Sequence, residues 1–219
     1  MISPLFTGDA FRVVREKMVI EHIVARGMRD AAVLAAMRSV PRHLFVSKEQ
    51  QSHAYDDSPL PIGHGQSISQ PYIVALITAL AQVRPGMRVL EIGSGCGYQT
   101  AVLAEMGAEV FSIEIVGELA ERSAKTLEEL GYRNVHVHTG DGYAGWPEHA
   151  PFGAIVLAAA PNRVPAPLLE QLDIGGRLVM PEGVAEQMLR VYTRESSGFS
   201  VRDIIGVRFV PMTGKAQEH

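Results

Sequence analysis

Several residue types and patterns are scarce in this 219-residue sequence, and each absence excludes a class of protein. A single cysteine forms no internal disulfide, so the chain is not a disulfide-stabilised secreted scaffold. The longest apolar run, residues 73–81, is interrupted by Thr78 and is well short of the roughly 18 residues of a membrane span. The N-terminus lacks the basic start, apolar middle and cleavage site of a secretory signal. We therefore expect a cytoplasmic protein without a membrane partner.

The charge balance gives no indication of a nucleic-acid partner. Twenty Lys and Arg residues against 24 Asp and Glu residues give a formal net charge of −4, and no long run carries one sign. A phosphate backbone therefore meets no general attraction. The eight histidines and one cysteine show neither H-E-x-x-H nor C-x-x-C spacing, so we expect no metal site. A hydrophobic content of 47% is that of an ordinary folded protein.

The N-terminal part predicts helices around an irregular segment. Residues 9–27 and 30–40 contain no proline, and each begins at an aspartate suited to an N-cap, so we expect two helices. Prolines and glycines break any periodicity between residues 41 and 71, which predicts a long loop. Long loops inside compact proteins are usually functional. A buried helix should follow over residues 73–83.

Strands and helices alternate after residue 85. Glycine-containing turns separate apolar segments, some of which have helical and some strand-like periodicity. The expected strands cover residues 87–92, 109–115, 135–138, 154–158 and 177–180, and the expected helices cover residues 98–106 and 118–130. We expect the strands at 135–138 and 154–158 to be short and buried. Residues 188–193 and 201–210 alternate in hydrophobicity around a Ser-Ser-Gly turn, which predicts an antiparallel hairpin.

This order of elements predicts an α/β fold with a doubly wound, mostly parallel, Rossmann-like sheet. We expect one domain over residues 1–219, in three parts. Helices and the loop occupy residues 1–84, a nucleotide-binding core residues 85–186, and the C-terminal hairpin and tail residues 187–219. In such sheets the ligand binds at the carboxyl ends of the strands.

A glycine-rich turn joins the first strand of the core to its helix. The stretch from Glu91 to Gln99 is E-I-G-S-G-C-G-Y-Q, with glycines at 93, 95 and 97. A dinucleotide fingerprint requires G-x-G-x-x-G, so the spacing departs from the NAD pattern. Glycines allow a ligand to approach the backbone closely, and the following helix presents free N–H groups. The alternative is a tight strand-to-helix turn without a ligand.

Two acids follow the next two strands. Glu114 ends the second strand of the core, where an acid in a doubly wound nucleotide site meets ribose hydroxyls. Gly140-Asp141-Gly142 ends the third strand, and Asp141 can accept a hydrogen bond from an adenine amine. Taken alone, Asp-Gly is more often only a turn. Polar features at three successive strand ends, without a P-loop or G-x-G-x-x-G, favour S-adenosylmethionine as the ligand.

The irregular segment contains a polar stretch, G-H-G-Q-S-I-S-Q-P-Y, over residues 63–72. It offers hydroxyl and amide groups, which can orient a nucleophile that is already ionised. The alternative is structural, with Ser69 or Gln70 capping the helix that begins at Pro71.

Together these segments resemble one enzyme family along nearly the whole chain. They are Arg26-Gly27-Met28, residues 40–46 (VPRHLFV), Ala54-Tyr55, residues 60–63 (LPIG), 66–72, 91–99, 112–114 (SIE), 140–142, Gly145-Trp146, 150–152 (APF) and 209–214 (FVPMTG). Their order and sequence are similar to those of the protein-L-isoaspartate O-methyltransferases. The loop around Ser69 is the most specific part, because generic methyltransferases lack it.

The resemblance implies a Rossmann-like S-adenosylmethionine-dependent methyltransferase in which Ser69 matches the family's active-site serine. It also implies a set of cofactor-binding positions. They are Gln66, Ser67, Ile68, Glu91, Gly93, Ser94, Gly95, Gly97, Glu114, Gly140, Asp141 and Thr213. Departures from the family are small: Cys96 and Ser67 stand where Ser and Thr are common, and residues 157–160 lack a Thr often found after the fourth strand.

The implied reaction is methyl transfer to the free α-carboxyl of an isoaspartyl residue in a damaged peptide or protein. Such a carboxyl has a reference pKa near 3.5, so it is already ionised at pH 7 and requires no general base. Ser69 would orient the reacting oxygen. Two alternatives stay open: a methyltransferase of the same fold acting on a small molecule or nucleic acid, and a non-catalytic binding domain.

Overall fold

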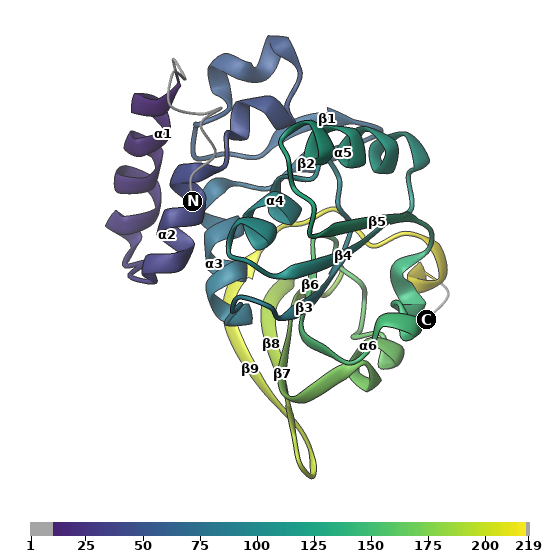
Figure 1. The fold of residues 1–219 in the computed structure, drawn as a ribbon. Helices are drawn as coiled ribbons and strands as arrows, with labels where there is room; N and C mark the ends of the chain where they lie inside the picture. Colours follow the sequence, from purple (N-terminus) through teal and green to yellow (C-terminus); the bar gives the residue numbers. More distant parts are fainter. Residues whose placement is uncertain (1–10, 218–219) are drawn as a thin grey trace.

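The computed structural model describes residues 11–217 and is built on one seven-stranded sheet in the order β5-β4-β3-β6-β7-β8-β9 (Figure 1). The strands from β5 to β7 are parallel, and β8 and β9 run antiparallel to their neighbours. The bounds are β3 Arg88–Ile92, β4 Glu109–Glu114, β5 Val135–Thr139, β6 Phe152–Leu157, β7 Leu172–Glu182, β8 Gln187–Glu195 and β9 Gly198–Val207. The mostly parallel sheet and the C-terminal hairpin are therefore as predicted.

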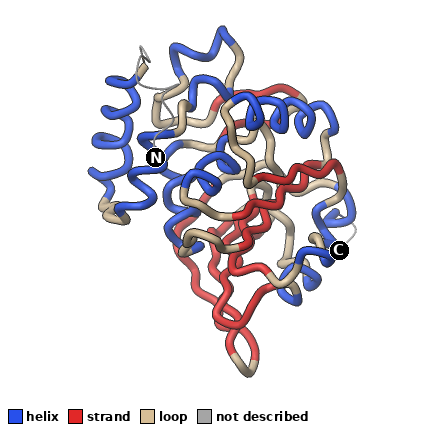
Figure 2. The backbone as a smooth tube through the Cα atoms, in the orientation of Figure 1, coloured by secondary structure: helices blue, strands red, loops and turns tan. Residues whose placement is uncertain are grey.

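Helices cover both faces of the sheet (Figure 2). The α-helices are α1 Arg12–Met18, α2 Ala31–Ser39, α3 Pro71–Ala81, α4 Tyr98–Glu105, α5 Gly117–Glu129 and α6 Ala166–Glu170. A π-helical turn, η2 Val19–Ile23, and a 3₁₀ turn, η3 Val24–Arg26, continue α1. Further 3₁₀ turns are η4 Arg42–Phe45, η5 Lys48–His53, η6 Gly142–Ala144, η7 Pro147–His149 and η8 Gly214–Gln217.

Alternation along the strands divides the apolar residues into two cores. On β3, Val89 packs in the core beneath α1 to α5, whereas Leu90 packs in the core beneath α6, η6 and η8. On β4, Val110 likewise packs in the first core and Phe111 in the second. Because both faces of the central strands are covered, β3 and β4 carry buried apolar residues on both faces, with Glu91, Ser112 and Glu114 as the buried polar exceptions.

Local sequence signals account for the best-predicted helices. Asp30 caps α2 through Oδ1, which accepts hydrogen bonds from the backbone N–H groups of Ala32 (2.9 Å) and Val33 (3.1 Å). The aspartate predicted to start the first helix lies outside the described residues. Helix α5 buries Leu119 and Leu127 against the sheet and exposes its charged face, as its periodicity predicts.

The sequence interpretation was wrong in four places. The segment expected to be irregular contains two 3₁₀ turns and an antiparallel hairpin of β1 Leu60–Gly63 and β2 Gln66–Ile68. Strand β5 is an edge strand whose residues are half-buried or exposed, not buried. The short helix α6 was not predicted, and β7 extends well beyond residues 177–180.

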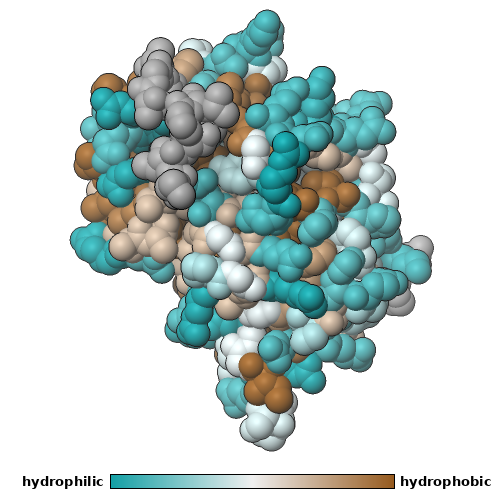
Figure 3. Space-filling view, in the orientation of Figure 1, coloured by the Kyte–Doolittle hydropathy of each residue, from teal (hydrophilic) through white to brown (hydrophobic). Residues whose placement is uncertain are grey.

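The chain after β9 returns to the carboxyl ends of the strands. The backbone N–H of Ala160 donates to the Val210 carbonyl, and that of Met212 donates to the Ala160 carbonyl, both at 2.8 Å. The β8–β9 ribbon projects beyond the rest of the sheet (Figure 1), and apolar atoms are visible near its tip in a mainly hydrophilic face (Figure 3). Among residues 11–217, no helix is both long and apolar enough to cross a membrane.

Candidate active site

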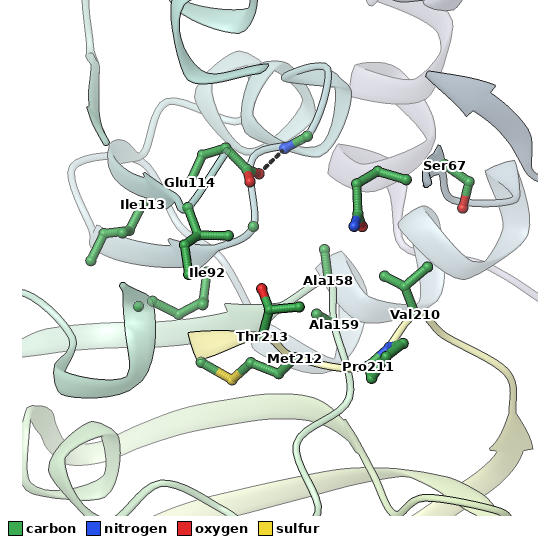
Figure 4. Close-up of a pocket in the computed structure, with 15 residues that line it drawn as sticks. Ser67, Ile92, Ile113, Glu114, Ala158, Ala159, Val210, Pro211, Met212 and Thr213 are labelled. Atoms are coloured by element: carbon green, nitrogen blue, oxygen red, sulfur yellow. Dashed lines mark hydrogen bonds between the residues drawn. The ribbon is translucent and has the colours of Figure 1, made fainter. Parts of the chain in front are cut away.

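A cleft of about 600 Å³, measured with its open mouth, lies at the carboxyl ends of β3, β4 and β6 (Figure 4). This is the edge at which doubly wound sheets bind ligands. Its walls come from the β1–β2 hairpin, the strand ends and the segment after β9. The lining residues are Gln66, Ser67, Ile92, Gly93, Gly95, Ile113, Glu114, Ile115, Gly142, Ala158, Ala159, Val210, Pro211, Met212 and Thr213.

Glycines of the turn after β3 leave room that a side chain would occupy. Gly93 and Gly95 line the cleft with φ of +91° and +53°, in the region where other residues are strained. A Cβ on Gly95 would lie 3.1 Å from Cδ1 of Ile62, which belongs to β1. Gly97 has φ of +89° but packs against α5, since a Cβ there would lie 3.1 Å from Cβ of Ser123. The first two glycines of the motif therefore face the cleft, and the third packs the helix.

Glu114 places a carboxylate in the cleft although only 5% of the residue is exposed. Its Oε2 accepts a hydrogen bond from the Gly95 N–H at 2.8 Å, drawn in Figure 4, and its Oε1 accepts one from the Val116 N–H at 3.0 Å. Each carboxylate oxygen can accept more than one hydrogen bond. The fixed carboxylate can therefore still accept from the hydroxyls of a ligand.

Asp141 connects the third strand end to the segment after β9. Its Oδ1 accepts a hydrogen bond from the Tyr143 N–H at 2.9 Å, and its Oδ2 accepts one from the Lys215 N–H at 2.8 Å. Gly214, with φ of +75°, lies so close that a Cβ there would be 2.5 Å from Oδ2. Asp141 itself is not among the cleft-lining residues, but the next residue, Gly142, is. Gly140 is also outside the lining.

Glu91 lies inside the protein and not in the cleft wall. It is fully buried, and its Oε2 accepts hydrogen bonds from Thr100 Oγ1 at 2.5 Å and Ser112 Oγ at 2.6 Å. Burial raises the pKa of the Glu91 carboxyl to about 7, because desolvation outweighs the two hydrogen bonds. Ser94 is also buried and faces Ser123, with 3.4 Å between the two Oγ atoms.

The β1–β2 hairpin supplies the other wall. Gln66 and Ser67 line the cleft, while Ile68 points into the core and is 3% exposed. Ser69 follows β2 directly and is half-buried, next to the cleft but outside its described lining. Of the predicted positions, the cleft thus brings together Gln66, Ser67, Gly93, Gly95, Glu114 and Thr213.

The likeness to known proteins extends over nearly the whole chain. The family model described as protein-L-isoaspartate(D-aspartate) O-methyltransferase matches residues 14–217. The chain belongs to this family. A protein-L-isoaspartate O-methyltransferase of Gloeobacter violaceus is 57% identical over 205 residues, which cover 92% of this chain and 100% of the relative.

Two solved structures of the isoaspartate O-methyltransferase family share the architecture. One, named protein-L-isoaspartate O-methyltransferase, has a TM-score of 0.85 at 30% identity and covers 92% of this chain and 67% of its own. The other, from Plasmodium falciparum and in complex with S-adenosyl-L-homocysteine, has a TM-score of 0.80 at 26% identity. It covers 91% of this chain and 98% of its own.

Sequence reasoning missed most of the apolar lining of this isoaspartate O-methyltransferase family member. The residues not predicted are Ile92, Ile113, Ile115, Gly142, Ala158, Ala159, Val210, Pro211 and Met212. Ile92, Ile113 and Ala158 lie at or just after the ends of strands, so their position was a usable signal. The segment 210–212 carries no such signal, because its place depends on the pairing of Ala160 with Pro211.

Proposed function

We propose that the chain transfers a methyl group from S-adenosylmethionine to the free α-carboxyl of L-isoaspartyl residues in damaged proteins. The observation that carries this proposal is the shortage of proton acceptors in the cleft. Among the 15 lining residues, only Glu114 has an ionisable side chain, and both its oxygens accept backbone N–H bonds. A substrate that must lose a proton, such as an amine, has no suited acceptor there, whereas a carboxylate needs none.

The residues of the cleft fit S-adenosylmethionine. Glu114 would accept hydrogen bonds from the ribose hydroxyls, and the apolar side chains of Ile92, Ile113 and Met212 offer the adenine a surface of low polarity. Gly93 and Gly95 allow the ligand to approach the backbone closely. When bound, S-adenosylmethionine supplies the electrophilic methyl group. The related Plasmodium falciparum structure contains S-adenosyl-L-homocysteine, the demethylated form of this cofactor.

The chain's own residues then have two tasks. Holding the carboxylate oxygen in line with the methyl group can supply up to about 7 to 11 kcal/mol of the barrier. We assign this orienting role to the Ser69 hydroxyl, which can donate a hydrogen bond without neutralising the nucleophile as Lys or Arg would. The second task is to remove water from the reacting oxygen, and the hairpin and the segment after β9, which form the sides of the cleft, would do so with the ligands bound.

Residues 1–84, 85–186 and 187–219 would act as one methyltransferase domain. Each of the three contributes to the same cleft, through Gln66, Glu114 and Thr213 respectively.

Transfer of labelled methyl groups to a matched pair of peptides tests the function. We expect labelling of an isoaspartyl peptide and little labelling of its aspartyl twin, with the label released as volatile methanol at mildly alkaline pH, since a carboxyl ester is labile there. Equal labelling of the two peptides would contradict the isoaspartyl substrate. Label that survives alkali would indicate N-methylation and the alternative methyltransferase activity, and binding of cofactor without transfer would indicate a binding domain.

A further inference from the structure

Three side-chain contacts surround the segment that follows Ser69. Gln70 Nε2 donates a hydrogen bond to the Asp57 carbonyl at 3.0 Å. The Arg26 guanidinium carbon lies 4.7 Å from the centroid of the Tyr72 ring, which is a cation–π distance. Arg26 and Asp57 are joined to each other by an ion pair of 2.6 Å between Nη2 and Oδ2. Asp57 and Arg26 therefore contact Gln70 and Tyr72, which follow Ser69 in the chain, and they do so from outside the cleft.

Ser69 depends on its backbone neighbours for its position. On its N-terminal side, Ile68 pairs with Leu60 in the β1–β2 ladder. On its C-terminal side, Gln70 is the N-cap residue of α3, but its side chain makes no capping bond and reaches Asp57 instead. No hydrogen bond among residues 11–217 involves the Ser69 side chain. Its hydroxyl is thus available to a substrate, and its placement relies on the flanking residues.

Arg26 and Asp57 are themselves held in place. Arg26 is the last residue of η3, and Gly27 ends that turn with φ of +91° and an N–H bond to the Val24 carbonyl at 2.9 Å. The Asp57 side chain is 18% exposed, and its Oδ1 is buried without a hydrogen-bond partner in the described part of the chain. A carboxylate in that setting depends on its single cation, because an unpaired buried charge is costly. Without Arg26, the Asp57 carboxylate would turn towards water, and any accompanying shift of its backbone would reach Gln70 through the hydrogen bond to the Asp57 carbonyl.

We propose that Arg26 and Asp57 are positioning residues for methyl transfer. They hold the Ser69–Gln70 segment so that the Ser69 hydroxyl reaches the substrate carboxylate, and they touch neither substrate nor cofactor. This inference rests on the proposed function. It also gives a physical role to the R-G-M segment at residues 26–28, which the cleft leaves unexplained. The competing interpretation is a partly exposed ion pair that contributes only slightly to stability.

The first test compares Arg26→Ala with a matched control, Arg38→Ala. Arg38 pairs with Glu16 at 2.9 Å, and the exposures of 40% and 45% are similar to the 45% of Arg26. We expect Arg26→Ala to lower kcat about tenfold, less than the roughly 100-fold cost of a 1 Å misplacement at the reaction centre. Affinity for S-adenosyl-L-homocysteine should not change, Arg26→Lys should recover most of the rate, and Arg38→Ala should stay within about twofold of the wild type.

A double-mutant cycle tests whether Arg26 acts through Ser69. In a Ser69→Ala background, Arg26→Ala should change kcat less than about twofold, since the group that it positions is gone. Asp57→Asn should behave in the same way. An Arg26→Ala rate equal to that of the wild type overturns the inference, and so does a full tenfold loss in the Ser69→Ala background. Circular dichroism and thermal unfolding of every variant show whether a lost rate is only lost folding.

The wild-type protein separates this inference from the proposed function. Wild-type activity on the isoaspartyl peptide together with unchanged Arg26 and Asp57 variants would overturn the positioning role alone. An inactive wild type would overturn the proposed function before any variant is compared, and the positioning role would fall with it.

Discussion

The two sides of the cleft are constructed differently. On the sheet side, Glu114 is 5% exposed, and the backbone N–H groups of Gly95 and Val116 fix its carboxylate. On the hairpin side, Ser67 is exposed, Ser69 is half-buried, and the segment after it is held by side chains such as Arg26, 45% of whose side chain is exposed. Backbone geometry therefore fixes Glu114 on the sheet side, whereas particular side chains fix the segment after Ser69 on the hairpin side, where we propose that the substrate carboxylate is oriented. Substitutions should consequently change substrate use more readily on the hairpin side.

The largest effect that we expect concerns the stability of the sheet side. The pKa of Glu91 is raised from 4.5 to about 7 in the folded protein, so its neutral form is favoured there. The contribution of Glu91 to the free energy of unfolding is therefore most favourable below about pH 4.5, and it is lost as the pH rises towards 7. Glu91→Gln removes this titration. Relative to the wild type, the free energy of unfolding of the variant should therefore rise by on the order of 3 kcal/mol as the pH increases from 4.5 to above 7.

Urea unfolding at several pH values measures this effect. The exposed Glu128→Gln in α5 is the matched control and should show no comparable trend. If the difference in the free energy of unfolding between wild type and Glu91→Gln stays constant from pH 4.5 to 8, the pKa of Glu91 is not raised in the folded protein.

The second effect concerns the hairpin side. Ser69→Ala should lower the methylation rate by about 10², by analogy with the loss of one oxyanion donor, without changing cofactor affinity. Single-turnover kinetics and calorimetry measure the two quantities, and the exposed Ser52→Ala in η5 is the control. A weaker affinity for S-adenosyl-L-homocysteine in Ser69→Ala would place this serine on the cofactor side and break the comparison.

The third effect concerns Glu114 on the sheet side, where we expect a loss of cofactor affinity, whereas Ser69→Ala should lower the methylation rate. Glu114→Ala should weaken cofactor binding by roughly 1 to 3 kcal/mol, because charge-assisted hydrogen bonds to the ligand are lost. Calorimetry with S-adenosyl-L-homocysteine measures this, with the exposed Glu121→Ala in α5 as the control. Unchanged affinity would remove Glu114 from the binding site.

The smallest effect concerns the tip of the β1–β2 hairpin. His64 Nε2 lies 2.9 Å from Glu118 Oε2, but the two side chains are 38% and 80% exposed. A pair this exposed contributes at most about 1 kcal/mol, so His64→Ala should shift Tm by less than about 4 °C. A much larger shift would show that an exposed contact fastens the hairpin to α5, and the contrast between the two sides would then be weaker.

Local signals in the sequence were sufficient for the elements that depend on local energetics. The Asp30 cap, the amphipathic α5 and the strand ending at Glu114 are all found where these signals place them. The β1–β2 hairpin was missed because its strands have only four and three residues, with a proline at position 61, and because Leu60, Ile62 and Ile68 are buried against residues distant in the sequence.

The two glutamates of the core show where site prediction reaches its limit. Glu91 and Glu114 both stand near strand ends beside predicted ligand contacts, yet Glu91 is buried between Thr100 and Ser112 and Glu114 faces the cleft. The parallel register pairs Glu91 with Ser112, so Glu114 lies on the same face of the sheet two residues nearer the carboxyl end. A difference of two positions along the strand therefore decides whether an acid meets the cleft or the core. The sequence alone does not establish where each strand ends to that accuracy.

Val210 to Thr213 complete the cleft, although they follow Glu114 in the chain by about 100 residues. At about 5 to 20 residues per second, ribosomal synthesis of that interval takes roughly 5 to 20 seconds. The glycine turn and Glu114 are therefore synthesised well before the wall that encloses them, and Asp141 is synthesised 74 residues before Lys215, whose N–H it binds. Tight cofactor binding should begin only after this last segment has been made, so a nascent chain cannot use the cofactor to assist its own early folding.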